Sequence, residues 1–362
     1  MPPASDAPQP DPARPTGPRA DAAAPPPRGE PVRIDAHGPL GDAALSVLMS
    51  GRADGPEPPV HAFRDHAATH QMDLSGLWAV CGRRGQPRQT ALAVPGVGRT
   101  AMLFLSPTTR KAQVGPAAEL TRTAIARPPV CGLPVVQALL SPEETLKAQA
   151  LERGGMTRLA ELMYLHRPAG DNIIERPDLA DPAAPAGLIR PRPEPADPDD
   201  PESLSGEAWT PDHDADFAQL IEASYEHTRD CPGLRGLRDI KDVIDGHRAT
   251  GVFHPGLWTL WSDRRGPVAA LLMAEAAPSG AQPAGSPPGA ELVYLGVAPR
   301  GRGRGLGAAL LRYGIAAAAP FGGAVSLAVD RDNPAARRLY RRAGFAPTAH
   351  RVAWIAVPPK AE

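Results

Sequence analysis

The sequence contains two similar successions of apolar and turn-forming segments, and this repeat restricts the fold more than any other feature. Residues 76–85 (GLWAVCGRRG) resemble residues 256–266 (GLWTLWSDRRG), and each is typical of a strand followed by a charged turn. The later apolar runs also correspond in pairs, 101–107 with 292–299 and 136–140 with 325–329. Both halves show the order strand, strand, strand, helix, strand, helix, strand. Several matches in one order favour a duplicated α/β domain.

Proline clusters divide the chain into segments. Residues 1–31 carry few large apolar side chains, so burial cannot offset the chain entropy and we expect a disordered tail. The Pro-rich stretch 176–202 predicts a semi-extended linker. Two domains are therefore predicted, at 32–175 and 203–358. A further Gly/Pro/Ser-rich stretch, 278–288, is predicted to join two strands.

Composition excludes several function classes. The formal net charge is −1, which gives no electrostatic indication of a nucleic-acid or membrane partner. The three cysteines are far apart and lack the spacing of metal ligands, so we expect no metal and a reducing compartment. No apolar run reaches the roughly 20 residues of a membrane span. The N-terminus lacks the apolar region of a signal peptide. We expect a cytoplasmic protein.

A loop rich in Gly and Arg separates an apolar run from a helical run in the second half. Residues 292–297 are typical of a strand and 308–313 of a helix, with RGRGLG at 302–307 between them. Consecutive amides, the positive end of the helix dipole and guanidinium groups favour a cradle for pyrophosphate. The alternatives are a flexible turn or a segment that contacts RNA. The flanking strand and helix favour the cradle, because RNA-binding Arg/Gly segments are usually found in disordered tails.

Residues 333–345 predict a short helix with defined ends. Asn333 is the expected N-cap, Pro334 suits the first helical position, and Gly344 is the expected C-terminal stop. From spacing alone Tyr340 is a core aromatic residue on the inward face. Glu291, at the start of the strand before the loop, is either a solvated acid or a general base.

These segments resemble the two signatures of the GNAT acetyltransferase superfamily. The acyl-CoA motif, Arg/Gln-x-x-Gly-x-Gly/Ala, is matched by Arg302, Gly305 and Gly307. The second signature, Asn-x-x-Ala-x-x-Leu-Tyr-x-x-x-Gly-Phe, is matched at every fixed position of 333–345. The repeat is similar to the layout of two-domain members such as mycothiol synthase, without indicating that substrate.

The resemblance implies an α+β fold with two tandem GNAT-like domains, each a mixed, mostly antiparallel sheet flanked by helices. It implies direct transfer of an acyl group from acyl-CoA, most simply acetyl-CoA, to an amine. Tyr340 would give a proton to the departing thiolate, and Glu291 would deprotonate the amine directly or through water. The implied cofactor-binding residues are Val297, Arg302, Gly303, Arg304, Gly305, Leu306, Gly307 and Asn333.

The implied acceptor side follows an amphipathic helix that carries Phe217, Leu220 and Ile221. In the family this region shapes the acceptor pocket, and the candidate residues are Tyr225, His227, Asp230 and Cys231. The alternative is a helix end followed by a capped turn. The acceptor would be a small-molecule or protein amine, and the sequence indicates neither its identity nor an oligomeric state.

The first half is predicted to lack this chemistry. Residues 111–113 (KAQ) stand where the second half has 303–305 (GRG), and Leu151, Glu144 and Arg99 stand at Tyr340, Asn333 and Glu291. We interpret this half as a scaffold or acceptor-side wall. Two other functions remain alternatives: an acyl-CoA-binding sensor without turnover, and an RNA-binding protein. Retention of Tyr340 and Glu291 argues against the sensor, and the near-neutral charge argues against RNA binding.

Overall fold

The computed structural model describes residues 29–54, 57–170, 204–276 and 289–360. The predicted linker and the predicted 278–288 connection lie outside the described residues, as does the predicted tail up to residue 28. The last residue assigned to the tail, Pro31, is the first residue of a strand. Below, residues 29–170 are called the first half and residues 204–360 the second half.

The first half contains six strands and four helices among its described residues. They are β1 (Pro31–Arg33), α1 (Gly41–Ser50), α2 (Glu57–Thr69), β2 (Leu77–Cys81), β3 (Pro87–Gly96), β4 (Thr100–Leu105), α3 (Lys111–Ala126), β5 (Val135–Leu140), α4 (Thr145–Arg153) and β6 (Thr157–Arg167).

The second half repeats this succession. Its elements are β7 (Ser205–Ala208), α5 (Asp214–Ser224), α6 (Ile240–Arg248), β8 (Val252–Asp263), β9 (Gly266–Glu275), β10 (Ala290–Val297), α7 (Leu306–Ala317), β11 (Val325–Asp330), α8 (Pro334–Arg342) and β12 (Ala346–Ala356), with short 3₁₀ turns between some of them. From β2 to β6 and from β8 to β12 the order is the predicted one, so the internal repeat is confirmed.

All twelve strands form one continuous sheet, with the order β1-β2-β3-β4-β5-β12-β6-β11-β10-β9-β8-β7. Only the β4–β5 and β10–β11 pairs are parallel among the described strands. The α+β fold with a mixed, mostly antiparallel sheet is therefore confirmed. The sequence did not predict that the two halves would share one sheet.

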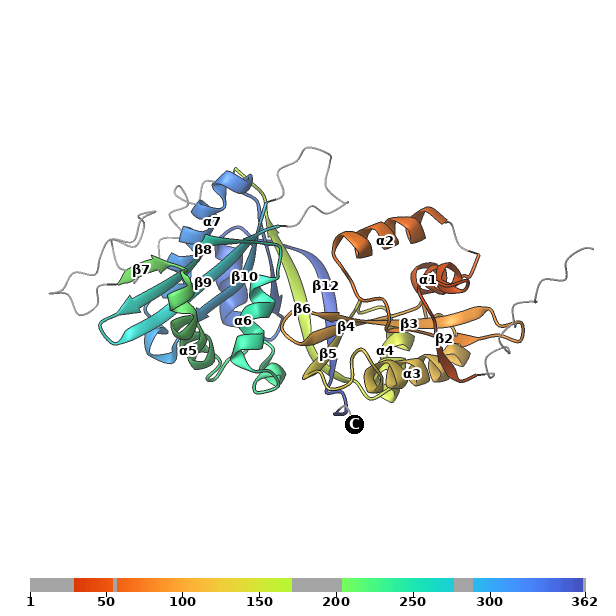
Figure 1. Cartoon of the computed structure of the whole chain (residues 1–362). Helices are drawn as coiled ribbons and strands as arrows, with labels where there is room; N and C mark the ends of the chain where they lie inside the picture. Colours follow the sequence, from red (N-terminus) through yellow and green to blue (C-terminus); the bar gives the residue numbers. More distant parts are fainter. Residues whose placement is uncertain (1–28, 55–56, 171–203, 277–288, 361–362) are drawn as a thin grey trace, which may run out of the picture.

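The halves exchange their final strands at the centre of this sheet. Strand β12, which ends the second half, pairs with β5 of the first half, and β6, which ends the first half, pairs with β11 of the second. The two exchanged strands also pair with each other over most of their length. In Figure 1 they cross the middle of the molecule, with the helices of the first half on one side and those of the second on the other.

Helices cover both faces of the sheet in each half because its strands are apolar on both sides. In the second half, α7 and α8 bury Leu310 and Tyr340 against one face, and α5 and α6 bury Phe217 and Ile244 against the other. In the first half, α3 and α4 cover one face while α1 and α2 cover the other. No helix in the described ranges combines the length and apolar content needed to cross a membrane.

Strands β10 and β11 separate soon after they begin to pair. Their register contains only Ala290 with Val325 and Glu291 with Ser326, and a bulge follows in β10 between Leu292 and Tyr294. Beyond these two pairs the backbone groups that β10 turns toward β11 have no partner strand. The sheet therefore opens along β10, toward the start of α7.

Candidate active site

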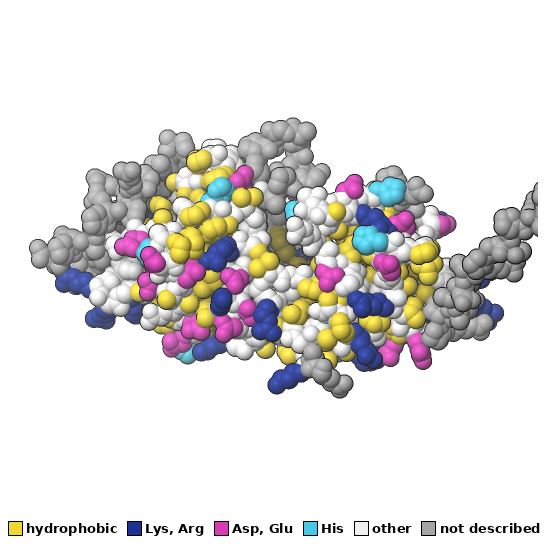
Figure 2. All heavy atoms as spheres, in the orientation of Figure 1, with side chains coloured by type: hydrophobic (Ala, Val, Ile, Leu, Met, Phe, Trp, Pro, Cys, Tyr) yellow, Lys and Arg dark blue, Asp and Glu magenta, His cyan; other side chains and the backbone are white. Residues whose placement is uncertain are grey.

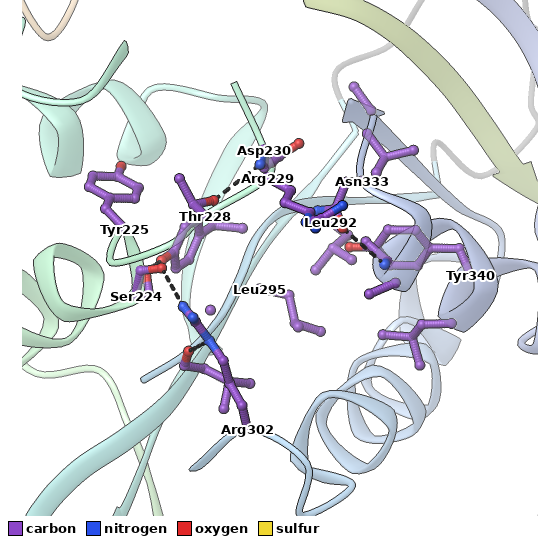
Figure 3. Close-up of a pocket in the computed structure, with 18 of the residues that line it drawn as sticks. Ser224, Tyr225, Thr228, Arg229, Asp230, Leu292, Leu295, Arg302, Asn333 and Tyr340 are labelled. Carbon is purple, nitrogen blue, oxygen red and sulfur yellow. Dashed lines mark hydrogen bonds between the residues drawn. The ribbon is translucent and has the colours of Figure 1, made fainter. Parts of the chain in front are cut away.

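A cavity of about 340 Å³ lies where β10 and β11 diverge. Its walls come from the end of α5 and the loop after it, from β10 and the end of β11, and from α8 (Figure 3). The predicted site residues that line it are Tyr225, His227, Asp230, Val297, Arg302, Asn333 and Tyr340. The structure thus brings together residues from the two sequence signatures and from the predicted acceptor segment.

The loop before α7 presents unpaired backbone amides. Gly303 and Gly305 have φ values of +77° and +75°, a conformation that glycine adopts without the cost of a Cβ. Within the described residues, the amides of 303–307 have no hydrogen-bond acceptor. They precede or open the first turn of α7, where the helix dipole favours an anion. This geometry suits the predicted pyrophosphate cradle.

The arginine side chains of this segment already have protein partners. Arg302 donates to the Ser224 carbonyl at 2.9 Å and to the Val297 carbonyl at 3.3 Å. Arg300 and Arg304 lie 2.5 and 3.5 Å from the carboxylate of Asp263, the last residue of β8. The guanidinium groups therefore fix the path of the loop, and the amides remain the groups free to bind an anion.

Tyr340 lies on the inward face of α8 and borders the cavity. The residue is 7% exposed, and burial, followed by the negative charge of Asp230, raises the pKa of its phenol. The hydroxyl makes no hydrogen bond to any described residue and keeps its proton at neutral pH. A protonated phenol at the cavity wall suits the predicted proton donor.

Asn333 begins α8 as predicted. Its Oδ1 accepts a hydrogen bond from the Ala336 amide at 3.2 Å, which caps the helix, and the remaining amide group of its side chain is free to meet a ligand. At the other end the Phe345 amide donates to the Tyr340 carbonyl at 3.0 Å, which closes the helix after Gly344. Both predicted helix ends are confirmed.

Glu291 does not line the cavity. It is half-buried at the last paired position of β10 and β11, and burial raises the pKa of its carboxyl above the usual range. A carboxyl with a raised pKa is better suited to accept a proton at neutral pH. Its position outside the lining favours action through water over direct contact with the reacting amine.

The acceptor segment is tied to the end of β11. The Asp330 amide donates to Asp230 Oδ1, and the Cys231 amide donates to Asp330 Oδ2, both at 3.0 Å. Ligand-type atoms of Asp230, Cys231 and Asp330 lie within 4.8 Å of one another. Since these carboxylates accept backbone hydrogen bonds, we interpret the cluster as a structural link that holds the loop after α5 against the end of β11.

The remaining acceptor candidates differ in exposure. Cys231 is outside the cavity lining, and burial together with Asp230 and Asp330 raises the pKa of its thiol to about 12, which makes it a poor nucleophile at neutral pH. Tyr225 is half-buried, and burial raises the pKa of its phenol. The His227 side chain is 83% exposed at the edge of the cavity, 3.4 Å from Glu226.

Comparison with known proteins agrees with this geometry. Residues 220–345 match the sequence profile of the Acetyltransferase (GNAT) family. The matched part of the second half therefore carries the GNAT family pattern. The matched range contains both signatures, the loop before α7 and the whole cavity lining. A comparison with curated protein sequences gives no significant match.

Three solved structures are similar to this chain in fold. A GCN5-related glucosamine N-acetyltransferase region of a fungal multi-domain GH3 beta-N-acetylglucosaminidase is 13% identical with a TM-score of 0.51, covering 90% of this chain and 38% of that one. A GCN5-related N-acetyltransferase from Sphaerobacter thermophilus is 17% identical (TM-score 0.49, 89% and 92% covered). A tandem GNAT protein from the clavulanic acid biosynthesis pathway is 16% identical (TM-score 0.46, 92% and 99% covered). At these identities the likeness concerns the fold alone.

Some polar groups of this GNAT site were not identified in the sequence. Ser224, Thr228, Arg229 and Tyr294 also line the cavity. The Tyr294 hydroxyl hydrogen-bonds to the Ser224 hydroxyl, and burial raises the pKa of the Tyr294 phenol. Tyr294 lies within an apolar strand, so the sequence pattern alone indicates a core residue. What turns its side chain to the cavity is the β-bulge between Leu292 and Tyr294, and the sequence pattern does not predict a bulge there.

In the first half, a side chain closes the loop that corresponds to the one before α7. The Gln113 side-chain oxygen accepts hydrogen bonds from the Thr109 and Arg110 amides, both at 2.9 Å. Helix α3 begins at Lys111, the position aligned with Gly303, whereas α7 begins three residues after Gly303. The first half therefore has a helical turn where the second half has the open glycine loop that presents the amides of 303–305. This supports our interpretation that the first half carries no second cofactor site.

Proposed function

We propose that the second half is an acyl-CoA-dependent N-acyltransferase that uses acetyl-CoA and transfers the acyl group directly to an amine. One observation carries the proposal. A single cavity between diverging strands is lined by Arg302, which precedes the loop of unpaired amides at 303–307, and by the buried phenol of Tyr340. A cofactor with a pyrophosphate and a reactive thioester needs these two groups at separate points of one site.

Each group of the site has a separate role in the proposed reaction. The amides of 303–307 bind the pyrophosphate, and the unpaired edge of β10 near Val297 pairs with the amide groups of the pantetheine arm. Glu291 accepts a proton from the acceptor ammonium through water, and the free amine attacks the thioester carbonyl. As the carbon–sulfur bond breaks, Tyr340 donates its proton to the leaving thiolate, and the second proton lost by the attacking nitrogen restores the phenol. General acid–base catalysis of this kind contributes ~10²–10⁴-fold in rate.

The acceptor is proposed to be a small-molecule or protein amine, bound near Tyr225, His227 and Asp230. Asp230 supplies a carboxyl beside the cavity that can meet a cationic amine. We also propose a cytoplasmic location. A reducing compartment is consistent with three free thiols, those of Cys81, Cys131 and Cys231.

The test combines binding and turnover. Calorimetry with acetyl-CoA should show a single site, and free-thiol release should accelerate with at least one member of a panel of glucosamine, spermidine, free amino acids and a lysine peptide. Absence of acetyl-CoA binding would refute the proposal. Tight binding without thiol release for every amine class would instead indicate the non-catalytic sensor.

A further inference from the structure

The exchanged strand β6 brings first-half side chains beside the active half. Its register with β11 pairs His166 with Ser326 and Tyr164 with Ala328. On its other side β11 pairs Ser326 with Glu291 of β10. Residues opposite one another in neighbouring strands share a face of the sheet, as do residues two apart along a strand. Glu291, Ser326, His166, Ala328 and Tyr164 therefore lie on one face.

This face is the one opposite α7 and α8. The intervening residues Leu165 and Leu327 point the other way and are buried in the core with Leu310 of α7. Val293, two residues after Glu291, packs instead in the core formed by α5 and α6. The face with Tyr164 thus continues the face on which α5 and the predicted acceptor segment lie.

The cavity contacts this row of side chains at Ala328. Ala328, the register partner of Tyr164, is exposed and lines the cavity. Tyr164 itself is half-buried, so one side of it is accessible. Figure 2 shows the molecule hollowed between its two lobes, where Figure 1 places β6 and β12. We expect an acceptor that enters through this hollow to pass β6 before it reaches the diverging strands.

The polar groups of the row interact with one another. His166 Nδ1 lies 3.0 Å from the Ser326 hydroxyl, one strand away from Glu291. Burial raises the pKa of the Tyr164 phenol, the positive charge of Arg351 opposes this, and the charge of Glu291 adds to it. The charge of Glu291 therefore acts on Tyr164, and the phenol stays protonated and able to donate a hydrogen bond.

We propose that Tyr164, supplied by the first half through the exchanged strand, is an acceptor-binding residue of the second-half active site. This rests on the proposed function, and it gives the first half a direct part in acceptor binding. The hydroxyl would hold the acceptor beside Glu291, on the side of the sheet opposite α7 and α8.

The test places an amine at this position and needs no knowledge of the natural acceptor. In Tyr164→Lys, the new side-chain ammonium should lose a proton to Glu291 through water, and the amine should then attack the thioester of bound acetyl-CoA. An amide forms and CoA leaves as the thiol, protonated by Tyr340, which recovers the second proton lost by the nitrogen. Mass spectrometry should find position 164 acetylated roughly 100-fold faster than the native Lys241, because a held nucleophile has a high effective concentration. Adding Tyr340→Phe should slow this reaction.

Two further lysine variants calibrate the result. Tyr313→Lys places the amine on α7, on the opposite face, and should be acetylated no faster than Lys241. Ala328→Lys places it on β11 beside the cavity and should be acetylated quickly. Rapid acetylation at 328 with none at 164 would overturn this inference and leave the proposed function standing. If the wild-type protein does not bind acetyl-CoA, the proposed function itself is wrong.

A smaller substitution covers the case in which Tyr164→Lys does not fold. Tyr164→Cys can be treated with bromoacetyl-CoA, whose reactive carbon lies beside the acetyl position and loses bromide to a thiolate. Alkylation at position 164 before Cys81 and Cys131 supports the proposal. Labelling of those native cysteines at the same rate as position 164 contradicts it.

Discussion

Tyr340 combines an apolar environment with a hydroxyl that has no protein partner in the described structure. If it protonates the leaving thiolate, Tyr340→Phe should lower turnover roughly 100-fold, within the range of general acid catalysis, while the ring still fills its place. Acetyl-CoA affinity measured by calorimetry should stay nearly unchanged. Tyr313→Phe, a tyrosine of α7 whose ring packs on Trp261, is the matched control and should keep full activity. Equal activity of both variants would remove Tyr340 from the chemistry.

His247 gives the folded state a specific sensitivity to acid. Burial, followed by the positive charge of Arg238, lowers the pKa of this histidine from 6.5 to about 4, and its ring lies 5.4 Å from that of Tyr294. Between these values the unfolded chain binds a proton that the folded chain does not, so the free energy of unfolding falls as the pH falls from 6.5 toward 4.

The corresponding measurement is urea unfolding at pH 7 and pH 5. The wild type should lose more stability between these two values than His247→Phe, which has no titrating group at this position. Protonation of other groups affects both proteins alike, so the difference between them isolates His247. An identical loss in both would show that folding does not lower the pKa of His247.

At the scale of elements, the loop before α7 depends on its backbone more than on its side chains. Gly305 has a φ of +75° and immediately precedes the helix, so a β-branched residue there strains the turn that aims the amides. Gly305→Val should weaken acetyl-CoA binding at least about tenfold by calorimetry, since one misplaced charge-assisted hydrogen bond costs ~1.5 kcal/mol or more.

Gly85 provides the control for this substitution. It lies in the turn between β2 and β3 with a φ of +78° and open space around it, far from the cradle in sequence. Gly85→Val should lower the melting temperature through similar backbone strain and leave acetyl-CoA affinity intact. If both variants bind acetyl-CoA like the wild type, the loop is not the cradle.

Helix α8 and the loop before α7 also show what a sequence can predict. The ends of α8 follow from Asn333, Pro334 and Gly344, because caps and stops act within a few residues of the chain. The partners of Arg302 and the placement of Glu291 outside the cavity depend on strands that are distant in sequence. The same holds for Gln113, whose side chain closes the first-half loop in a way that the repeat alone did not indicate.

At the scale of the molecule, the repeat predicted two similar halves but not the exchange of their last strands. The apolar pattern of β6 suits any neighbour in an antiparallel sheet, so it does not specify whether β5 or β11 lies beside it. The predicted boundaries at 175 and 203 divide the sequence, whereas β6 of the first half pairs along the full length of β11. Each half therefore supplies one strand to the sheet of the other half, and the two halves pack together at the centre of the sheet.

This exchange predicts that the halves fold together. Residues 204–360 alone lack β6, which leaves the backbone groups of β11 unpaired and removes Leu165 from the core shared with α7. This fragment should aggregate or bind acetyl-CoA weakly. Co-expression with residues 29–170 as a separate chain should restore a soluble one-to-one complex, with affinity near that of the intact protein. A second-half fragment that melts and binds acetyl-CoA like the full chain would contradict the prediction, because it would show that β11 needs no strand from the first half.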